Sequence, residues 1–109
     1  RPWGRYVNLF EGKNFLVKEL TVNSKSSISL QKHHHRSEHW MITDGKPEIT
    51  INKKKFFIKP DESVFIPTGA IHRIENHFKK IVKIIEVQTG PILKETDIVR
   101  YKDIYGRIK

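Results

Sequence analysis

The stretch that decides the fold is QKHHHRSEHW at residues 31–40, which gathers several side chains able to bind a metal. A second stretch further along the chain, PTGAIHRIEN at residues 67–76, brings another histidine just after a tight Pro-x-Gly turn. Imidazole nitrogens and carboxylate oxygens suit Zn, Fe, Mn, Ni and Co. Together the two segments predict one divalent-metal site inside a small all-β barrel.

The chain has 109 residues, no cysteine and a formal net charge of +9 at pH 7. This length suits one modest hydrophobic core, so we expect a single domain over residues 1–109. No apolar run approaches the ~20 residues that cross a bilayer, and no signal peptide is visible. Because no disulfide can form either, we expect a cytoplasmic protein with no membrane contact.

The positive charge favours an anionic partner such as a phosphorylated metabolite. Nucleic-acid modules usually combine a basic stripe with exposed aromatics or carry a recognition helix, and neither is visible here. The lysine run at 53–55 falls where a hairpin turn is expected, which indicates a solvated turn. We therefore expect no nucleic-acid partner.

Short runs of β-branched and apolar residues follow one another with turn signals between them and no helical period. They predict strands over 14–22, 27–33, 38–43, 48–52, 55–59, 63–66, 70–75 and 81–88. Such spacing is typical of an all-β sandwich or barrel. Near the end, Thr96 and Asp97 are expected to cap a short C-terminal helix running towards Gly106.

Alternate residues of a strand point to the same face, so 27–35 carries a polar face that ends in His33 and His35. A polar face is unusual for a barrel interior unless something is coordinated there. The three consecutive histidines could also be a surface tract, since a single histidine on a strand is usually exposed. Their joint spacing with Glu38 and His72 favours the metal site.

The second stretch, Pro67-x-Gly69-x-x-His72-x-x-x-Asn76, resembles the second motif of the cupin superfamily. The first cupin motif places a His-x-His pair three or four residues before a Glu. Four residues lie between Gln31-x-His33 and Glu38, whereas only two follow His35. The resemblance therefore implies a cupin barrel, a double-stranded β-helix, whose metal ligands are Gln31, His33, Glu38 and His72, with His35 as the alternative to Gln31.

The implied ion is Zn, with Mn, Co, Ni or Fe as alternatives. Lys25 stands where the first cupin motif begins with Gly, which affects only the conformation of a turn. Cupin domains commonly dimerise, and exposed sheet edges need cover, so a homodimer is expected.

A closer resemblance covers nearly the whole chain. It rests on RPWGRY at 1–6, LQKHHHRSEHW at 30–40, IPTGAIHRIEN at 66–76, IEVQTG at 85–90, DIVR at 97–100 and DIYGR at 103–107. These stretches resemble the type II mannose-6-phosphate isomerase domain, which in many bacteria follows a mannose-1-phosphate guanylyltransferase in one bifunctional protein. The resemblance implies interconversion of mannose 6-phosphate and fructose 6-phosphate, for GDP-mannose and polysaccharide biosynthesis. The nucleotide-binding half is not visible in this chain.

Aldose–ketose isomerisation needs an oxyanion stabiliser, a proton relay and a cation for the phosphate. The metal would supply the first. The expected proton relay is His35 or Glu86, and Glu86 shares strand parity with Gln88. The side chains expected to bind the phosphate are Arg36 and Arg73, followed by Arg100 and Arg107. A non-catalytic sugar-binding cupin or an accessory domain of a guanylyltransferase is the alternative, and another metal-dependent cupin enzyme stays open.

Overall fold

The computed structural model describes residues 2–102, which form ten strands. The strands are β1 (Gly4–Gly12), β2 (Phe15–Val22), β3 (Leu30–Lys32), β4 (Ser37–Asp44), β5 (Glu48–Ile51), β6 (Lys54–Phe57), β7 (Ser63–Ile66), β8 (His72–Glu75), β9 (Val82–Thr89) and β10 (Val99–Lys102). Within this part of the chain, no helix has the length and apolar character that a membrane crossing requires.

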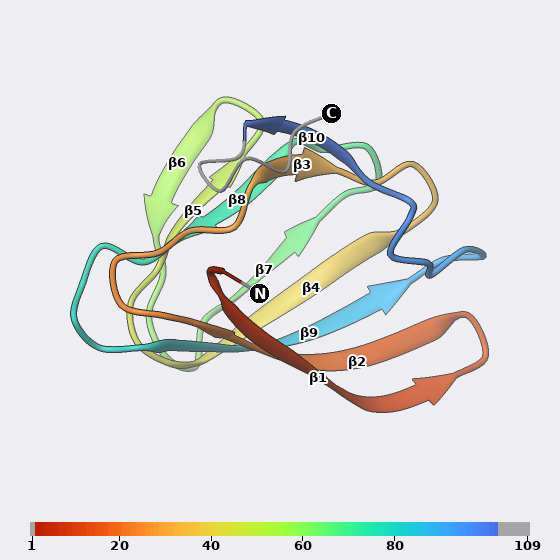
Figure 1. Ribbon diagram of the computed structural model, residues 1–109. Coiled ribbons are helices and arrows are strands. Elements are labelled where there is room, and N and C mark those ends of the chain that lie inside the picture. Colours follow the sequence, from red (N-terminus) through yellow and green to blue (C-terminus); the bar gives the residue numbers. More distant parts are fainter. Residues whose placement is uncertain (1, 103–109) are drawn as a thin grey trace.

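The strands make two five-stranded antiparallel sheets that face each other (Figure 1). The first sheet has the order β1-β2-β9-β4-β7 and the second has the order β10-β3-β8-β5-β6. Consecutive strands therefore alternate between the sheets at several points, which closes the structure into a barrel-like sandwich. The prediction of an all-β fold is confirmed.

The inward faces of β4 and β9 change from apolar to polar along the strands. On β9 the buried residues run from Val82 and Ile84 at one end to Glu86 and Gln88 at the other. The neighbouring β4 runs antiparallel to β9 and so carries Glu38 at the matching polar end. One end of the barrel is thus a hydrophobic core and the other holds buried polar groups.

The expected strands are present with shifted ends, and two strands were missed. The predicted strand 27–33 is reduced to β3, while β1 and β10 lie where no strand was expected. Lys25 takes a φ of 52°, the left-handed region in which the motif's usual glycine has no steric cost.

The prediction of a C-terminal helix from Thr96 towards Gly106 is wrong over the described residues. Val99–Lys102 is strand β10, paired antiparallel with β3, and residues 103–106 lie outside the described part of the chain. Asp97 does not cap a helix, because its carboxylate accepts hydrogen bonds from the backbone N–H groups of His34 and His35, both at 2.9 Å. The Asp97 carboxylate therefore binds backbone groups more than 60 residues away instead of the nearby N–H groups of a helix.

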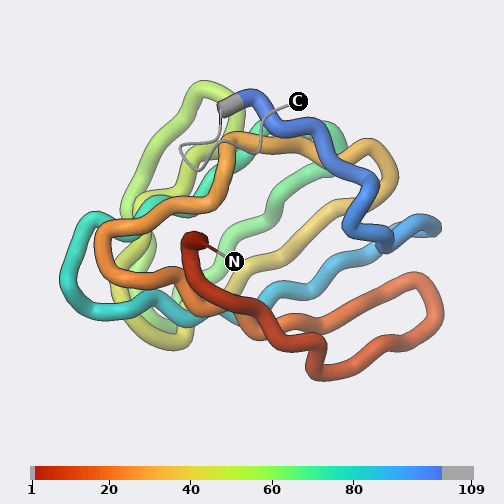
Figure 2. The backbone as a smooth tube through the Cα atoms, viewed as in Figure 1, coloured from red at the N-terminus to blue at the C-terminus, as the bar shows by residue number. Residues whose placement is uncertain are grey.

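Residues 90–98 connect the two sheets and are called the closing segment below. Figure 2 shows this segment, in blue, leaving the end of β9 in the first sheet and reaching the second sheet, where β10 begins. It passes over the polar end of the barrel, and Glu95 and Ile98 line the cavity there.

Candidate metal centre

Three buried side chains from different parts of the chain meet at the polar end of the barrel. His33 Nε2 lies 3.3 Å from Glu38 Oε2, and His72 Nε2 lies 3.9 Å from Glu38 Oε1. One ligand atom from each residue lies within 4.8 Å of the other two. Ligands bound at ~2.0–2.2 Å around one ion are themselves ~3–4 Å apart, so this spacing fits a divalent metal.

The local backbone explains why these side chains converge. Glu38 lies on β4 of the first sheet, His72 opens β8 of the second sheet, and His33 follows directly after β3. The Pro-x-Gly turn closes through a hydrogen bond from Ala70 N to the Pro67 carbonyl, and the N–H of Gly69 donates to the His33 carbonyl at 2.9 Å. The turn thus fixes both histidines relative to each other.

Backbone carbonyls fix the tautomer of both histidines. His33 Nδ1 lies 2.6 Å from the Asp97 carbonyl, and His72 Nδ1 lies 2.9 Å from the Ala70 carbonyl. A carbonyl can only accept, so each Nδ1 carries the proton and each Nε2 keeps a lone pair facing Glu38. This arrangement is the one a metal-binding imidazole needs.

Both rings are neutral at neutral pH. Burial, with the Arg36 guanidinium as the next cause, lowers the pKa of His33 to about 4. Burial also lowers the pKa of His72. Two neutral imidazoles and one carboxylate are a donor set that Zn and related divalent ions accept.

A buried guanidinium lies directly against this donor set. Arg36 Nε donates to Glu38 Oε2 at 3.0 Å, Nη2 donates to His33 Nε2 at 3.1 Å, and Nη1 donates to the Lys94 carbonyl at 3.3 Å. An ion bound by the three ligands would need the His33 lone pair that now accepts from Arg36. The donor chemistry therefore fits a metal, provided that Arg36 turns away from His33.

A cavity of about 70 Å³ that opens to solvent adjoins the cluster. Gln31 lines it from β3, where it pairs with His72 of β8 and with Arg100 of β10. Directly opposite residues of antiparallel strands share a face, so these three side chains project to the same side of the second sheet. The basic residues in the lining are Lys18, Arg36 and Arg100, and the acidic ones are Glu38, Glu86 and Glu95.

Glu86 is held in the wall of the cavity by two donors. Trp40 Nε1 donates to Glu86 Oε2 and to Glu38 Oε1, both at 3.0 Å, and Gln88 Nε2 donates to Glu86 Oε1 at 2.7 Å. Burial, reinforced by the nearby Glu38 carboxylate, raises the pKa of Glu86 to about 8. Its carboxyl group is therefore able to exchange a proton near neutral pH.

The structure does not bring every expected site residue to the cavity. The side chain of His35 is 50% exposed and pairs with Asp97 at 3.3 Å, outside the cavity lining. Arg73 neighbours His72 and so points to the opposite face of β8, where its Nε lies 3.6 Å from Glu75. Arg107 lies outside the described residues.

Lys18 and Asp97 are among the residues of the site that escaped the sequence reasoning. Lys18 is buried between Leu16 and Leu20 on the inward face of β2, so strand alternation alone could have marked it as unusual. Asp97 was read as a helix cap, and nothing local in the sequence shows that its carbonyl reaches His33. That contact depends on the long-range pairing of β10 with β3.

The two five-stranded sheets that close into a barrel, with the buried His–Glu–His cluster inside, define a cupin fold, also called a double-stranded β-helix. A Klebsiella pneumoniae protein with a double-stranded β-helix domain superimposes with a TM-score of 0.78 at 13% identity, over 92% of this chain and 85% of that one. A cupin-2 domain protein from Rhodospirillum rubrum gives a TM-score of 0.72 at 16% identity, over 84% and 66% of the two chains. These likenesses show the fold.

The sequence defines the family more closely. The profile described as Mannose-6-phosphate isomerase C-terminal matches residues 1–103, and the chain belongs to this family. The chain is 45% identical over 107 residues to the alginate biosynthesis protein AlgA of Pseudomonas putida, and 43% identical over 108 residues to the mannose-1-phosphate guanylyltransferase ManC of Salmonella typhimurium. The two matches extend over 98% and 99% of this chain but over only 22% of the length of each relative.

Proposed function

We propose that this chain is a metal-dependent aldose–ketose isomerase domain that interconverts mannose 6-phosphate and fructose 6-phosphate. The observation that carries the proposal is the buried cluster of His33, Glu38 and His72 beside a cavity whose lining includes both basic and acidic side chains. Membership of the mannose-6-phosphate isomerase C-terminal family supports the choice of substrate.

The ligands of the metal in this proposal are His33, Glu38 and His72, with Gln31 as a fourth. The preferred ion is Zn, with Mn, Co, Ni or Fe as alternatives. When bound, the ion supplies a Lewis acid for the oxygen that becomes negative during isomerisation. The backbone carbonyls behind the two histidines hold the rings in the ligand orientation.

Glu86 is the proposed proton relay, since it lines the cavity whereas His35 lies outside it. A carboxyl group whose pKa is raised to about 8 can exchange its proton close to neutral pH, which suits a group that both takes and returns a proton. Arg100 and Arg36 are the proposed arginine ligands of the phosphate. Arg100 has a buried Nε without a hydrogen-bond partner among the described residues, so it can donate to a ligand without breaking an existing bond.

The test is a coupled assay for fructose 6-phosphate formation from mannose 6-phosphate. Chelator-treated protein should lose turnover and regain it with added divalent metal. His72→Ala should lower turnover by about 100-fold or more and abolish stoichiometric metal binding, because it removes one buried ligand. His77→Ala, which removes a half-exposed histidine on the next turn, is the matched control. Unchanged turnover in His72→Ala would remove the site from the mechanism.

A non-catalytic role is the second candidate, as a sugar-binding accessory domain of a guanylyltransferase. It is favoured by the Arg36 guanidinium, which already satisfies Glu38 and His33, and by a relative named as a mannose-1-phosphate guanylyltransferase. This reading expects saturable binding of mannose 6-phosphate with no turnover at any metal concentration.

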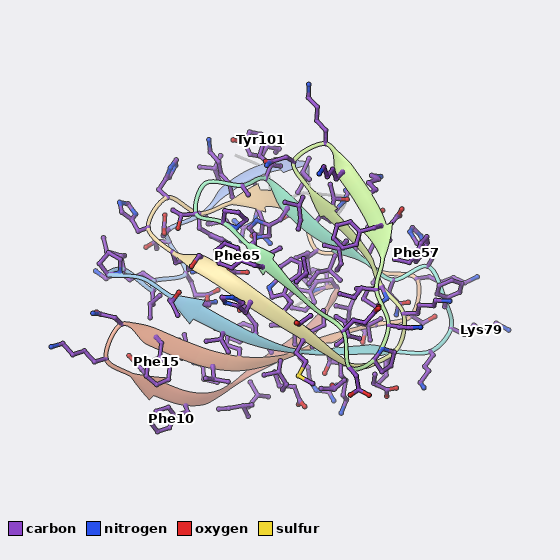
Figure 3. The ribbon with its side chains drawn as sticks, turned by 180° about the vertical axis from the view of Figure 1, so that it is seen from behind. Phe10, Phe15, Phe57, Phe65, Lys79 and Tyr101 are labelled. Carbon is purple, nitrogen blue, oxygen red and sulfur yellow. The ribbon has the colours of Figure 1, made fainter. Side chains whose placement is uncertain are left out.

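We also infer that the chain forms a homodimer through the outer face of the first sheet. The register places Phe10, Val17, Val87, His39 and Phe65 in one row across the five strands. Figure 3, the view from behind, shows Phe10 and Phe15 pointing outward at the end of the β1–β2 hairpin. The row carries no formal charge in a chain of net charge +9, so two copies can approach there with the least repulsion.

A further inference from the structure

Lys18 is a buried cation that the isomerase scheme above does not use. It projects inward from β2, is only 4% exposed and lines the same cavity as the metal cluster. Strand pairing sets Lys18 directly beside Glu86 of β9, which in turn lies beside Trp40 of β4. A lysine is almost never buried this deeply unless something pairs with its charge.

The partner of Lys18 comes from the closing segment. Lys18 Nζ donates to Glu95 Oε2, and the ring of Tyr6 covers the ammonium from another side, with its centroid 4.3 Å from Nζ. The two members of the ion pair differ in exposure, because the Glu95 side chain is 51% exposed and the Lys18 side chain only 5%. The carboxylate therefore borders on water, whereas the ammonium is enclosed in the wall.

We propose that Lys18 is an anion-binding residue of this cavity and that the Glu95 carboxylate occupies the position of a ligand's phosphate group until the phosphate displaces it. In this exchange the phosphate replaces the Glu95 carboxylate as the partner of the Lys18 ammonium, so the buried ammonium is never left without an anion. Arg100 is a second cation in the lining of the same cavity. The proposal rests on the proposed function for the identity of the phosphate, a sugar phosphate.

The first test uses inorganic phosphate and chelator-treated protein, so that it depends on neither metal nor turnover. Titration calorimetry should show that Lys18→Met weakens phosphate binding by about tenfold or more, since a buried charge-assisted hydrogen bond is lost. Glu95→Gln should strengthen binding by about three- to tenfold, because the internal competitor is gone. Lys80→Met, which removes an exposed surface lysine, should leave the affinity unchanged.

The double variant separates the proposed exchange from a general effect of charge. In the Lys18→Met background, Glu95→Gln should no longer change the affinity, because there is no ammonium left to compete for. An equal gain in both backgrounds would overturn the proposal, as would wild-type protein that binds no phosphate or Lys18→Met protein that binds it normally. Lys18→Arg keeps the charge and should bind within about threefold of wild type; a loss equal to that of Lys18→Met would show a packing role and overturn the proposal.

The isomerase assay distinguishes failure of this proposal from failure of the proposed function. Phosphate binding that depends on Lys18 in a protein without turnover would support the anion site and overturn the isomerase. Turnover with a KM for mannose 6-phosphate that Lys18→Met leaves unchanged would support the isomerase and overturn the anion site.

Discussion

At the scale of single residues, the carboxyl group of Glu86 shows how burial sets chemistry. It accepts hydrogen bonds from Trp40 and Gln88, and the same Trp40 N–H also donates to Glu38, so the two carboxyl groups lie close together. Two carboxylates in one buried site cannot both be charged without a large electrostatic cost. Glu86 therefore keeps its proton while Glu38 accepts from Arg36.

This arrangement makes stability depend on pH with a defined sign. The pKa of Glu86 rises from a usual value of 4.5 to about 8 in the folded protein, so between these pH values the folded state binds more protons than the unfolded state. The contribution of Glu86 to the free energy of unfolding must then fall as pH rises from about 4.5 to 8 and level off above. Glu86→Gln removes this titration. It should be near neutral at pH 4.5 and stabilising on the order of 2–4 kcal/mol at pH 8.

Urea unfolding of chelator-treated wild type and Glu86→Gln, measured from pH 4.5 to 8.5, checks this expectation. Glu62→Gln, a change at an exposed carboxylate, serves as the control. Two stability profiles that stay parallel over the whole range would show that Glu86 titrates normally.

At the scale of elements, the closing segment ties the metal cluster to the rest of the barrel. Asp97 serves twice: its carbonyl orients His33, and its carboxylate accepts the backbone N–H groups of His34 and His35. The histidine-rich loop between β3 and β4 is therefore held in place by a residue far along the chain. This explains how a loop, rather than a strand, can present a metal ligand at a fixed position.

Asp97→Asn should loosen this loop, because the amide keeps only one acceptor oxygen for two donors. We expect unfolding to become easier by about 1–3 kcal/mol and metal affinity to fall by about 10- to 100-fold. Urea unfolding and competition with a chromogenic chelator measure the two effects. Asp44→Asn, at a partly exposed carboxylate paired with Lys80, is the control. If both variants changed stability and metal affinity equally, Asp97 would not be the residue that holds the loop.

The sequence predicted the elements that show a regular alternation and missed those that do not. On β4 and β9 buried and exposed sides alternate cleanly, and both were predicted. Most of β1 is exposed at a sheet edge, so no buried face marks it in the sequence. The short β10 has no such pattern and is a strand because β3 offers it a partner, which is a tertiary effect.

The same distinction holds for the candidate site. Motif spacing predicted His33, Glu38 and His72, and strand parity predicted that Glu86 faces inward. Parity would also have placed Arg73 on the opposite face from its neighbour His72, so adjacency in sequence was a poor guide to the cavity. Lys18 and Glu95 meet only because the closing segment folds over β2, which no local pattern shows.

At the scale of the whole molecule, the outer face of the first sheet leads to an expectation about assembly. Wild-type protein should sediment as a dimer at micromolar concentration, since the row of Phe10, Val17, Val87, His39 and Phe65 offers a surface without formal charge, with both phenylalanines exposed. Phe10→Lys with Phe65→Lys should give a monomer by adding like charges to both copies.

Sedimentation velocity over a range of concentrations checks this assembly. Phe57→Lys, a change at an exposed phenylalanine on β6 of the second sheet, is the control and should remain dimeric. A wild-type monomer at all concentrations, or a dimer that survives the double change, would place the interface elsewhere.

The contact between His33 and the Asp97 carbonyl also constrains how the protein matures. Synthesis on the ribosome proceeds from the N-terminus, so His33, Glu38 and His72, the three candidate metal ligands, emerge before residue 97 does. Until then the imidazole of His33 lacks the acceptor that selects its tautomer, and β3 lacks the neighbour that covers its edge. A competent site can therefore arise only after translation has passed the closing segment, and early metal capture by the nascent chain would involve a differently arranged set of ligands.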